Sequence, residues 1–138
     1  MATIITPRPP LNLFEVVRKS LTSSWQNLYE VPFYEVPASG PNPARTIDAA
    51  AIITNLIVAN QSATTINASV RIVDALNNTF LVANEIPVFA NDFATYSLER
   101  YVLKSGEAIQ IQLKADQTGF AHMSFVLNQR EEFTEIAP

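Results

Sequence analysis

The sequence contains no cysteine, only three glycines and a single histidine. Without cysteine, the chain has no disulfide, no thiolate ligand for a metal and no thiol nucleophile. Gly40, Gly106 and Gly119 lie far apart, so they do not form a glycine-rich loop that binds phosphate. His122 alone does not make a transition-metal site, and no G-x-S-x-G motif accompanies it. The sequence therefore predicts a protein that is not an enzyme and holds no metal or cofactor.

Charged residues are also scarce, at 16% of the chain against about a quarter in an average protein. The nine basic residues are scattered, with Arg18 and Lys19 as the closest cluster, and the net charge is −4. Nucleic-acid binding needs clustered basic side chains, so this pattern argues against it. Much of the surface is instead neutral and polar, which is easy to desolvate and suits a protein packed against others.

The acidic residues offer two weak alternatives. Asp92 and Glu99 are close in sequence and could form the carboxylate pair of a glycosidase. Asp74, Asp92 and Asp116 lie in expected turns and could each bind calcium, but their spacing is not that of an EF-hand. We interpret all of them as solvated charges.

No apolar stretch approaches the ~20 residues of a membrane-spanning helix. The longest, from Ala49 to Ala59, is interrupted by Thr54 and Asn55. Residues 1–8 lack the charged start and long apolar run of a secretory signal. The sequence thus predicts a protein that is made and kept soluble in a cytoplasm until it joins something, and that does not bind a membrane.

With 138 residues, of which 48% are hydrophobic, the chain is expected to form one domain, preceded by an extended arm over residues 1–46. Seven of the nine prolines lie in this arm, and proline disfavours regular sheet. Apolar residues nevertheless run through it and need a surface to cover. That surface is either the domain's own core or a neighbouring subunit. In the second case the arm lies along the neighbour, and its predicted interface residues are Leu13, Phe14, Trp25, Tyr29, Phe33 and Tyr34.

One short helix is also predicted within the arm, over residues 13–21. Leu13, Val16, Val17, Ser20 and Leu21 recur at helical spacing, and Asn12 with Glu15 resembles a capping box. Val16 and Val17 are β-branched, which is unfavourable for a helix.

Residues 47–138 are typical of β-strands joined by turns. Residues 66–72 alternate apolar and polar side chains, as do residues 109–114 and 121–128, the last with His122, Ser124 and Asn128 facing outward. Further strands are expected over 47–60, 80–86 and 93–98, with Pro87 ending its strand or confining it to a sheet edge. Residues 116–119 are expected to close a hairpin. The pattern predicts an all-β, antiparallel β-sandwich of seven or eight strands, Ig-like or jelly-roll-like.

The aromatic residues of the arm allow two interpretations. Trp25, Tyr29, Phe33 and Tyr34 could form a platform that stacks on sugars. Alternatively, they are buried on the sandwich itself or on a partner, where tryptophan and tyrosine are frequent anchors. We favour the second interpretation.

Three short motifs resemble a loose class of small virion proteins from tailed bacteriophages. In order, they are residues 28–32 (LYEVP), 52–62 (IITNLIVANQS) and 103–109 (LKSGEAI), followed by a final strand near Ser124. The resemblance covers about residues 28–127. Glu107 stands where Asp is more frequent, and the arm before residue 28 lies outside the match.

The resemblance implies a compact sandwich and a non-enzymatic structural role in the virion, in many copies. The expected sites are capsid decoration, neck, or tail and baseplate. The expected partners are copies of the chain and other virion proteins, namely capsid, neck or tail subunits. The alternative function is a β-sandwich module that binds carbohydrate or a host surface.

Overall fold

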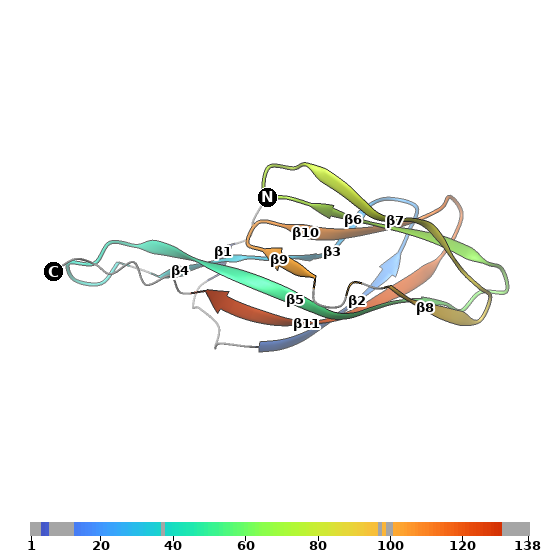
Figure 1. Ribbon diagram of the computed structural model, residues 1–138, viewed down its shortest axis with the longest axis horizontal. Helices are drawn as coiled ribbons and strands as arrows, with labels where there is room; N and C mark the ends of the chain where they lie inside the picture. Colours follow the sequence, from blue (N-terminus) through green and yellow to red (C-terminus); the bar gives the residue numbers. More distant parts are fainter. Residues whose placement is uncertain (1–3, 6–12, 37, 97, 99–100, 131–138) are drawn as a thin grey trace.

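The computed structural model describes residues 4–5, 13–36, 38–96, 98 and 101–130. Within these ranges every regular element is a β-strand, and two sheets pack face to face (Figure 1). Apart from the parallel pair β1 and β4, all pairings are antiparallel. The predicted antiparallel β-sandwich is therefore confirmed, although it has eleven described strands rather than seven or eight.

The larger sheet contains seven strands, which are β1 (Ile4–Ile5), β4 (Phe33–Val36), β5 (Arg45–Asn60), β11 (Gly119–Arg130), β2 (Leu13–Leu21), β8 (Asp92–Tyr96) and β9 (Val102–Lys104). The smaller sheet contains four strands, which are, in spatial order, β3 (Gln26–Glu30), β10 (Ala108–Leu113), β6 (Ile66–Val73) and β7 (Thr79–Val88). The strands at the two ends of a sheet have one unpaired edge. Among the described strands, β2 ends the larger sheet on one side, and β3 and β7 end the smaller sheet.

The long strand β5 is the central element of the larger sheet. One of its edges pairs with β11 over residues 48–59, and the other pairs successively with β4, β9 and β8. Ile53 and Leu56 are fully buried on its inner face, whereas Ile52 and Ile57 are half-buried on the outer face. The predicted strand over residues 47–60 is thus confirmed, with only its inner face fully covered.

Large aliphatic side chains from both sheets fill the space between them. Tyr29 of β3 stacks on Phe125 of β11 with ring centroids 4.3 Å apart, so one aromatic pair joins the two layers. The largest fully buried side chains are Phe125, Ile53, Leu56, Ile66, Leu103, Ile109, Ile111, Leu113, Met123, Val31, Val58 and Val70. Burial of apolar surface at about 25 cal/mol per Å² is the main force that holds the sheets together.

The predicted helix over residues 13–21 is wrong, because these residues form β2 and pair with β11 from Leu13 to Leu21. Leu13, Val17 and Leu21 are four residues apart, and a spacing of four fits the strand period of two as well as a helical turn. The residues between them distinguish a strand from a helix. Phe14 and Val16 are exposed while Glu15 is half-buried, which is the alternation of a strand.

Two other expectations also change. Residues 116–119 do not close a hairpin, since β10 pairs with β3 and β6 in the smaller sheet while β11 lies in the larger one. Both strands bury one apolar face, and facing sheets allow each to do so against the other. The described part of the predicted arm contributes β1, β2, β3 and β4 to the sandwich, and the expected boundary at residue 46 falls inside β5.

Strand β4 and the start of β5 form a hairpin that extends beyond the body of the sandwich (Figure 1). Ser39 and Asn42 close its turn with two backbone hydrogen bonds of 3.0 and 2.9 Å. Gly40 supplies the left-handed backbone that the turn requires, with φ of +56°.

A tight turn over residues 104–107 connects the two sheets at the base of this hairpin. The Gly106 N–H donates to the Val31 carbonyl, and the Val31 N–H donates to the Glu107 carbonyl, both at 2.9 Å. The Glu107 carboxylate accepts the Lys104 N–H at 2.8 Å and so closes the turn on itself. Two of the three sequence motifs, residues 28–32 and 103–109, therefore meet in space and have a structural role there.

Gly106 is expected to be the glycine most sensitive to substitution. Its φ is +85°, and an added Cβ would lie 3.0 Å from the Ala75 Cβ. Gly106→Ala should lower the free energy of unfolding by about 2 kcal/mol, measured by urea denaturation. Gly40→Ala is the matched control, because Gly40 also has a positive φ but nothing lies within 4 Å of its added Cβ. An equal loss of unfolding free energy in both variants would show that crowding of the added Cβ at Gly106 does not contribute to the effect.

Removal of the Tyr96 hydroxyl is not expected to destabilise the protein. Its hydroxyl is buried without a hydrogen-bond partner among the described residues, and burial raises the pKa of Tyr96 to about 12. Tyr96→Phe should leave the free energy of unfolding unchanged or raise it by about 1 kcal/mol, since an unpaired buried hydroxyl is costly. A clear loss of stability in the same urea titration would show that the hydroxyl is paired.

Candidate interaction surface

The structure separates the six residues predicted to form an interface into inner and outer ones. Tyr34 is 4% exposed, and burial raises its pKa. Tyr29 is stacked on Phe125, and burial raises its pKa as well, assisted by Tyr34 and Glu15 nearby. Leu13 packs against the core from the inner face of β2. These three side chains are directed toward the protein's own core.

The other three predicted residues are more accessible. Phe14 is 79% exposed on the outer face of β2. Trp25 is half-buried, and the guanidinium of Arg71 covers its ring at 4.2 Å from the centroid, a cation–π contact. Phe33 is half-buried at the start of β4. Phe14 and Phe33 thus lie at positions where a partner could reach them, while one ring face of Trp25 is already occupied.

Phe14 belongs to an apolar row that crosses the outer face of the larger sheet. Direct cross-strand pairing places Phe14 opposite Val126, Val126 opposite Ile52, and Ile52 opposite Val102. Residues directly opposite one another point to the same face of a sheet. Four strands therefore present one apolar side chain each, side by side, and neighbouring strands are about 4.8 Å apart. We call these four residues the outer row.

The outer row departs from the usual rule for a solvated sheet face. Strands with one face on the core normally carry polar residues on the other, and single exposed apolar side chains need no explanation. Here the exposed members, Phe14 and Val102, stand at the two ends, and the half-buried Val126 and Ile52 connect them. Aligned apolar residues on a solvent face are typical of a contact surface.

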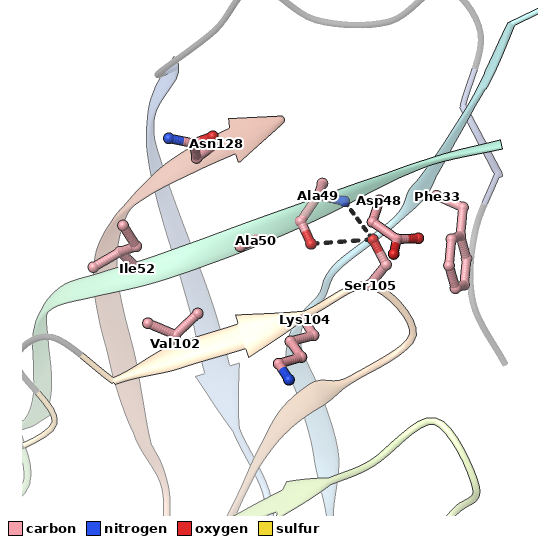
Figure 2. Close-up of a pocket in the computed structure, with 9 residues that line it drawn as sticks. All are labelled: Phe33, Asp48, Ala49, Ala50, Ile52, Val102, Lys104, Ser105 and Asn128. Carbon is pink, nitrogen blue, oxygen red and sulfur yellow. Dashed lines mark hydrogen bonds between the residues drawn. The ribbon is translucent and has the colours of Figure 1, made fainter. Parts of the chain in front are cut away.

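A hollow of about 750 Å³ adjoins the row where β5, β9 and β11 meet the base of the hairpin. Figure 2 shows the residues that line it, which are Phe33, Asp48, Ala49, Ala50, Ile52, Val102, Lys104, Ser105 and Asn128. Ile52 and Val102 belong to both the hollow and the outer row. Asp48 and Lys104 are exposed and carry opposite charges. The hollow therefore combines an apolar floor with charged and polar side chains.

Ser105 fixes the backbone at the inner end of the hollow. The Ala49 N–H donates to the Ser105 Oγ at 2.6 Å, and the Ser105 hydroxyl lies 3.1 Å from the Ala49 carbonyl (Figure 2). The same hydroxyl lies 3.0 Å from the Pro32 carbonyl, to which it can donate. The Ser105 N–H donates to the Ala49 carbonyl at 3.0 Å. Because these bonds are buried, they hold the 104–107 turn against β5 and set the shape of the hollow.

The polar residues considered from the sequence are not brought together. His122 faces outward as predicted, and its Nδ1 accepts a hydrogen bond of 3.1 Å from Arg18 Nε. Asp74 accepts backbone N–H groups in its own turn, and the hydrogen bond from Asn78 is the main cause of its lowered pKa. Asp92 is exposed, and Glu99 lies outside the described residues. The described ranges contain no group of three or more potential metal ligands, and no helix in them could cross a membrane.

Sequence reasoning missed three members of the outer row. The sequence around each of these residues, Val126, Ile52 and Val102, is apolar or alternating. The sequence of one strand does not show which side chains of the other strands lie beside its own. A signal did exist in β11, where the apolar residues Phe120 and Val126 share the outward alternation with His122, Ser124 and Asn128. The row itself appears only once the register is known.

Comparison with protein-family models, with curated proteins and with solved structures finds no match to this chain.

Ser105→Ala tests whether Ser105 is needed to hold the turn over residues 104–107 against β5. The substitution leaves the Ala49 N–H without its buried acceptor, which should lower the free energy of unfolding by about 2 kcal/mol. Urea denaturation gives the value, and Ser23→Ala, at an exposed serine, is the control. A loss no larger than that of the control would contradict the role assigned to Ser105.

Proposed function

We propose that this protein is a non-enzymatic structural component of a tailed-phage virion, present in multiple copies. On this proposal, it joins other virion proteins through the outer row and the adjoining hollow. The observation that supports the proposal is the outer row, because four paired strands place Phe14, Val126, Ile52 and Val102 on one solvent face. The resemblance of residues 28–127 to small phage virion proteins supplies the setting.

The row would act as the apolar centre of an interface, with charged and polar residues at its rim. Interfaces commonly have this arrangement, in which a desolvated apolar core is surrounded by polar side chains. Phe14 at one end and Phe33 beside the hollow supply aromatic side chains of the kind that anchor protein contacts. Lys104 and Asp48 at the hollow can pair with charges of a partner.

The carbohydrate-binding alternative receives less support from the geometry. A sugar-stacking platform needs aromatic rings with open faces. Tyr34 is buried, Tyr29 is stacked on Phe125, and Arg71 covers one face of Trp25. Of the four aromatic residues considered for a platform, Phe33 lines the hollow described above.

Particle incorporation of a row variant tests the proposal. Val102→Asp places a charge in the outer row at a side chain that is 45% exposed, so the fold should persist. We expect at least a tenfold loss of incorporation, equivalent to about 1.4 kcal/mol of contact energy. The measurement is the number of copies per purified particle, by quantitative mass spectrometry, in phage that encode the variant chain.

Thr95→Asp is the matched control, since Thr95 is exposed on the outer face of β8 but lies outside the row. It should be incorporated normally. Wild-type chain that is absent from purified particles would overturn the virion role. Normal incorporation of Val102→Asp would leave the chain in the virion but overturn the outer row as its contact.

A further inference from the structure

Strand β2 has a long and regular free edge. It ends the larger sheet, and no described strand pairs with it on the side away from β11. Its nine residues, Leu13–Leu21, pair with β11 without a register shift. Strands β3 and β7, which end the smaller sheet, both pair with their neighbours through shifted registers. Because such irregularities hinder pairing with another chain, β2 is the best suited of these three edges to receive one.

The inner face of this edge carries two opposite charges. Glu15, Val17 and Lys19 lie directly opposite residues of β11 that are fully buried, so all three face the space between the sheets. The Lys19 Nζ donates to the Asn27 carbonyl of β3 at 2.9 Å, which places its amine at the open side of the sandwich. An ammonium group has three donors, so Lys19 can keep this bond and also contact a carboxylate.

Inward charges on an edge strand limit which strands can pair with it. A strand that adds to β2 covers Glu15 and Lys19, and burying a charge without a partner is costly. Proteins use inward-pointing charges to prevent sheet edges from pairing indiscriminately. The strand that occupies the β2 edge must therefore bring one acidic and one basic side chain in matching positions.

A second copy of β2 meets this requirement. In antiparallel pairing about a two-fold axis at Val17, residues equally far before and after Val17 face each other. Each Glu15 then lies directly opposite Lys19 of the other copy, and the contact contains this charge pair twice. Opposite charges at directly opposed positions stabilise a sheet. Leu13 lies opposite Leu21, so all nine residues of β2 are paired.

Other antiparallel registers lose the match between the charges. A shift by two residues in either direction places both charges opposite apolar residues, namely Val17 and either Leu13 or Leu21. A shift by one residue places inner side chains opposite outer ones and breaks the alternation of the strand. The register centred on Val17 also suits the outer face, where Val16 lies opposite Arg18 and the aliphatic stem of the arginine can cover it.

We propose that two copies of this chain pair antiparallel through β2, about a two-fold axis at Val17, so that their larger sheets form one continuous sheet. Each copy uses the same surface, so the contact closes on itself and gives a dimer. The axis is perpendicular to the joined sheet, and the outer rows of both copies therefore lie on one common face. The inference goes beyond the proposed function and does not require it, since the pairing is a property of the purified protein.

Two charge reversals and their mixture test the register. Glu15→Lys places a lysine opposite Lys19 of the other copy, and Lys19→Glu places a glutamate opposite Glu15. Each variant alone should weaken dimerisation at least tenfold relative to wild type in sedimentation-velocity experiments. In an equimolar mixture, every lysine of the first variant faces a glutamate of the second. The mixture should therefore dimerise about as strongly as wild type.

Three results would overturn the proposal, provided that circular dichroism shows each variant to be folded. They are wild-type protein that stays monomeric at every accessible concentration, single variants that dimerise like wild type, and a mixture that associates no better than its components. Val102→Asp is the control, because Val102 lies three strands away from β2 and this variant should dimerise normally. Its effect on particle incorporation reports separately on the proposed function.

A cross-link at the two-fold axis gives a second measurement that retains both charges. The chain has no cysteine, so Val17→Cys introduces one thiol per copy. Directly opposite side chains have Cβ atoms about 4.5–5.5 Å apart, which approaches the separation in a disulfide. Oxidised glutathione should therefore convert this variant to a covalent dimer, seen on a denaturing gel.

Ser20→Cys is the matched control for the cross-link, because Ser20 is an exposed residue of the same strand. In the proposed register Ser20 faces Phe14 of the other copy, and the two Ser20 residues are six positions apart along the paired strands, about 20 Å. Ser20→Cys should cross-link far more slowly than Val17→Cys. A rate for Val17→Cys no higher than that of the control would contradict the two-fold axis at Val17.

Discussion

The arrangement of the candidate surface depends on the buried hydrogen bonds that join the 104–107 turn to both sheets. In this turn the Ser105 Oγ accepts a hydrogen bond from the Ala49 N–H of β5. Gly106 and Glu107 form backbone hydrogen bonds with Val31, which follows β3. Burial of aliphatic side chains brings two sheets together without fixing their relative position, because the hydrophobic effect is not directional. Buried hydrogen bonds are directional and have no water competing for them, so they fix the relative position of the two sheets. The hollow and the adjoining end of the outer row lie where these bonds are made.

The general architecture could be predicted from the sequence because it depends on local patterns. Alternation over residues 66–72 and 121–128 predicts β6 and β11, and Pro87 predicts that its strand lies at a sheet edge. Prediction failed where a pattern fits two periods or where a turn allows two geometries. Residues 13–21 satisfied helical spacing while forming β2, and the turn before Gly119 could have closed a hairpin but instead crosses to the other sheet.

The candidate surface was less predictable for a related reason. Phe14 was expected to bind a partner, but Val126 beside it and Val102 at the other end of the outer row are more than eighty residues away in sequence. Tyr29 and Tyr34 are aromatic residues of a proline-rich segment, yet they contribute to the core because β3 and β4 belong to the sheets. Proline density in residues 1–46 suggested chain outside the sandwich, whereas Pro32 lies in the short link between β3 and β4 and its carbonyl can accept the Ser105 hydroxyl.

Strand β2 connects the core of the sandwich to the candidate contact surface. Leu13 and Val17 pack against the core from its inner face, whereas Phe14 on its outer face ends the outer row. Successive side chains of a strand point to opposite faces, so burial of Leu13 and Val17 places Phe14 in solvent. The pairing of β2 with β11 then sets Phe14 beside Val126. Residues 13–21 are therefore an integral strand of the sandwich, and the burial of one of its faces determines what its other face presents to a partner.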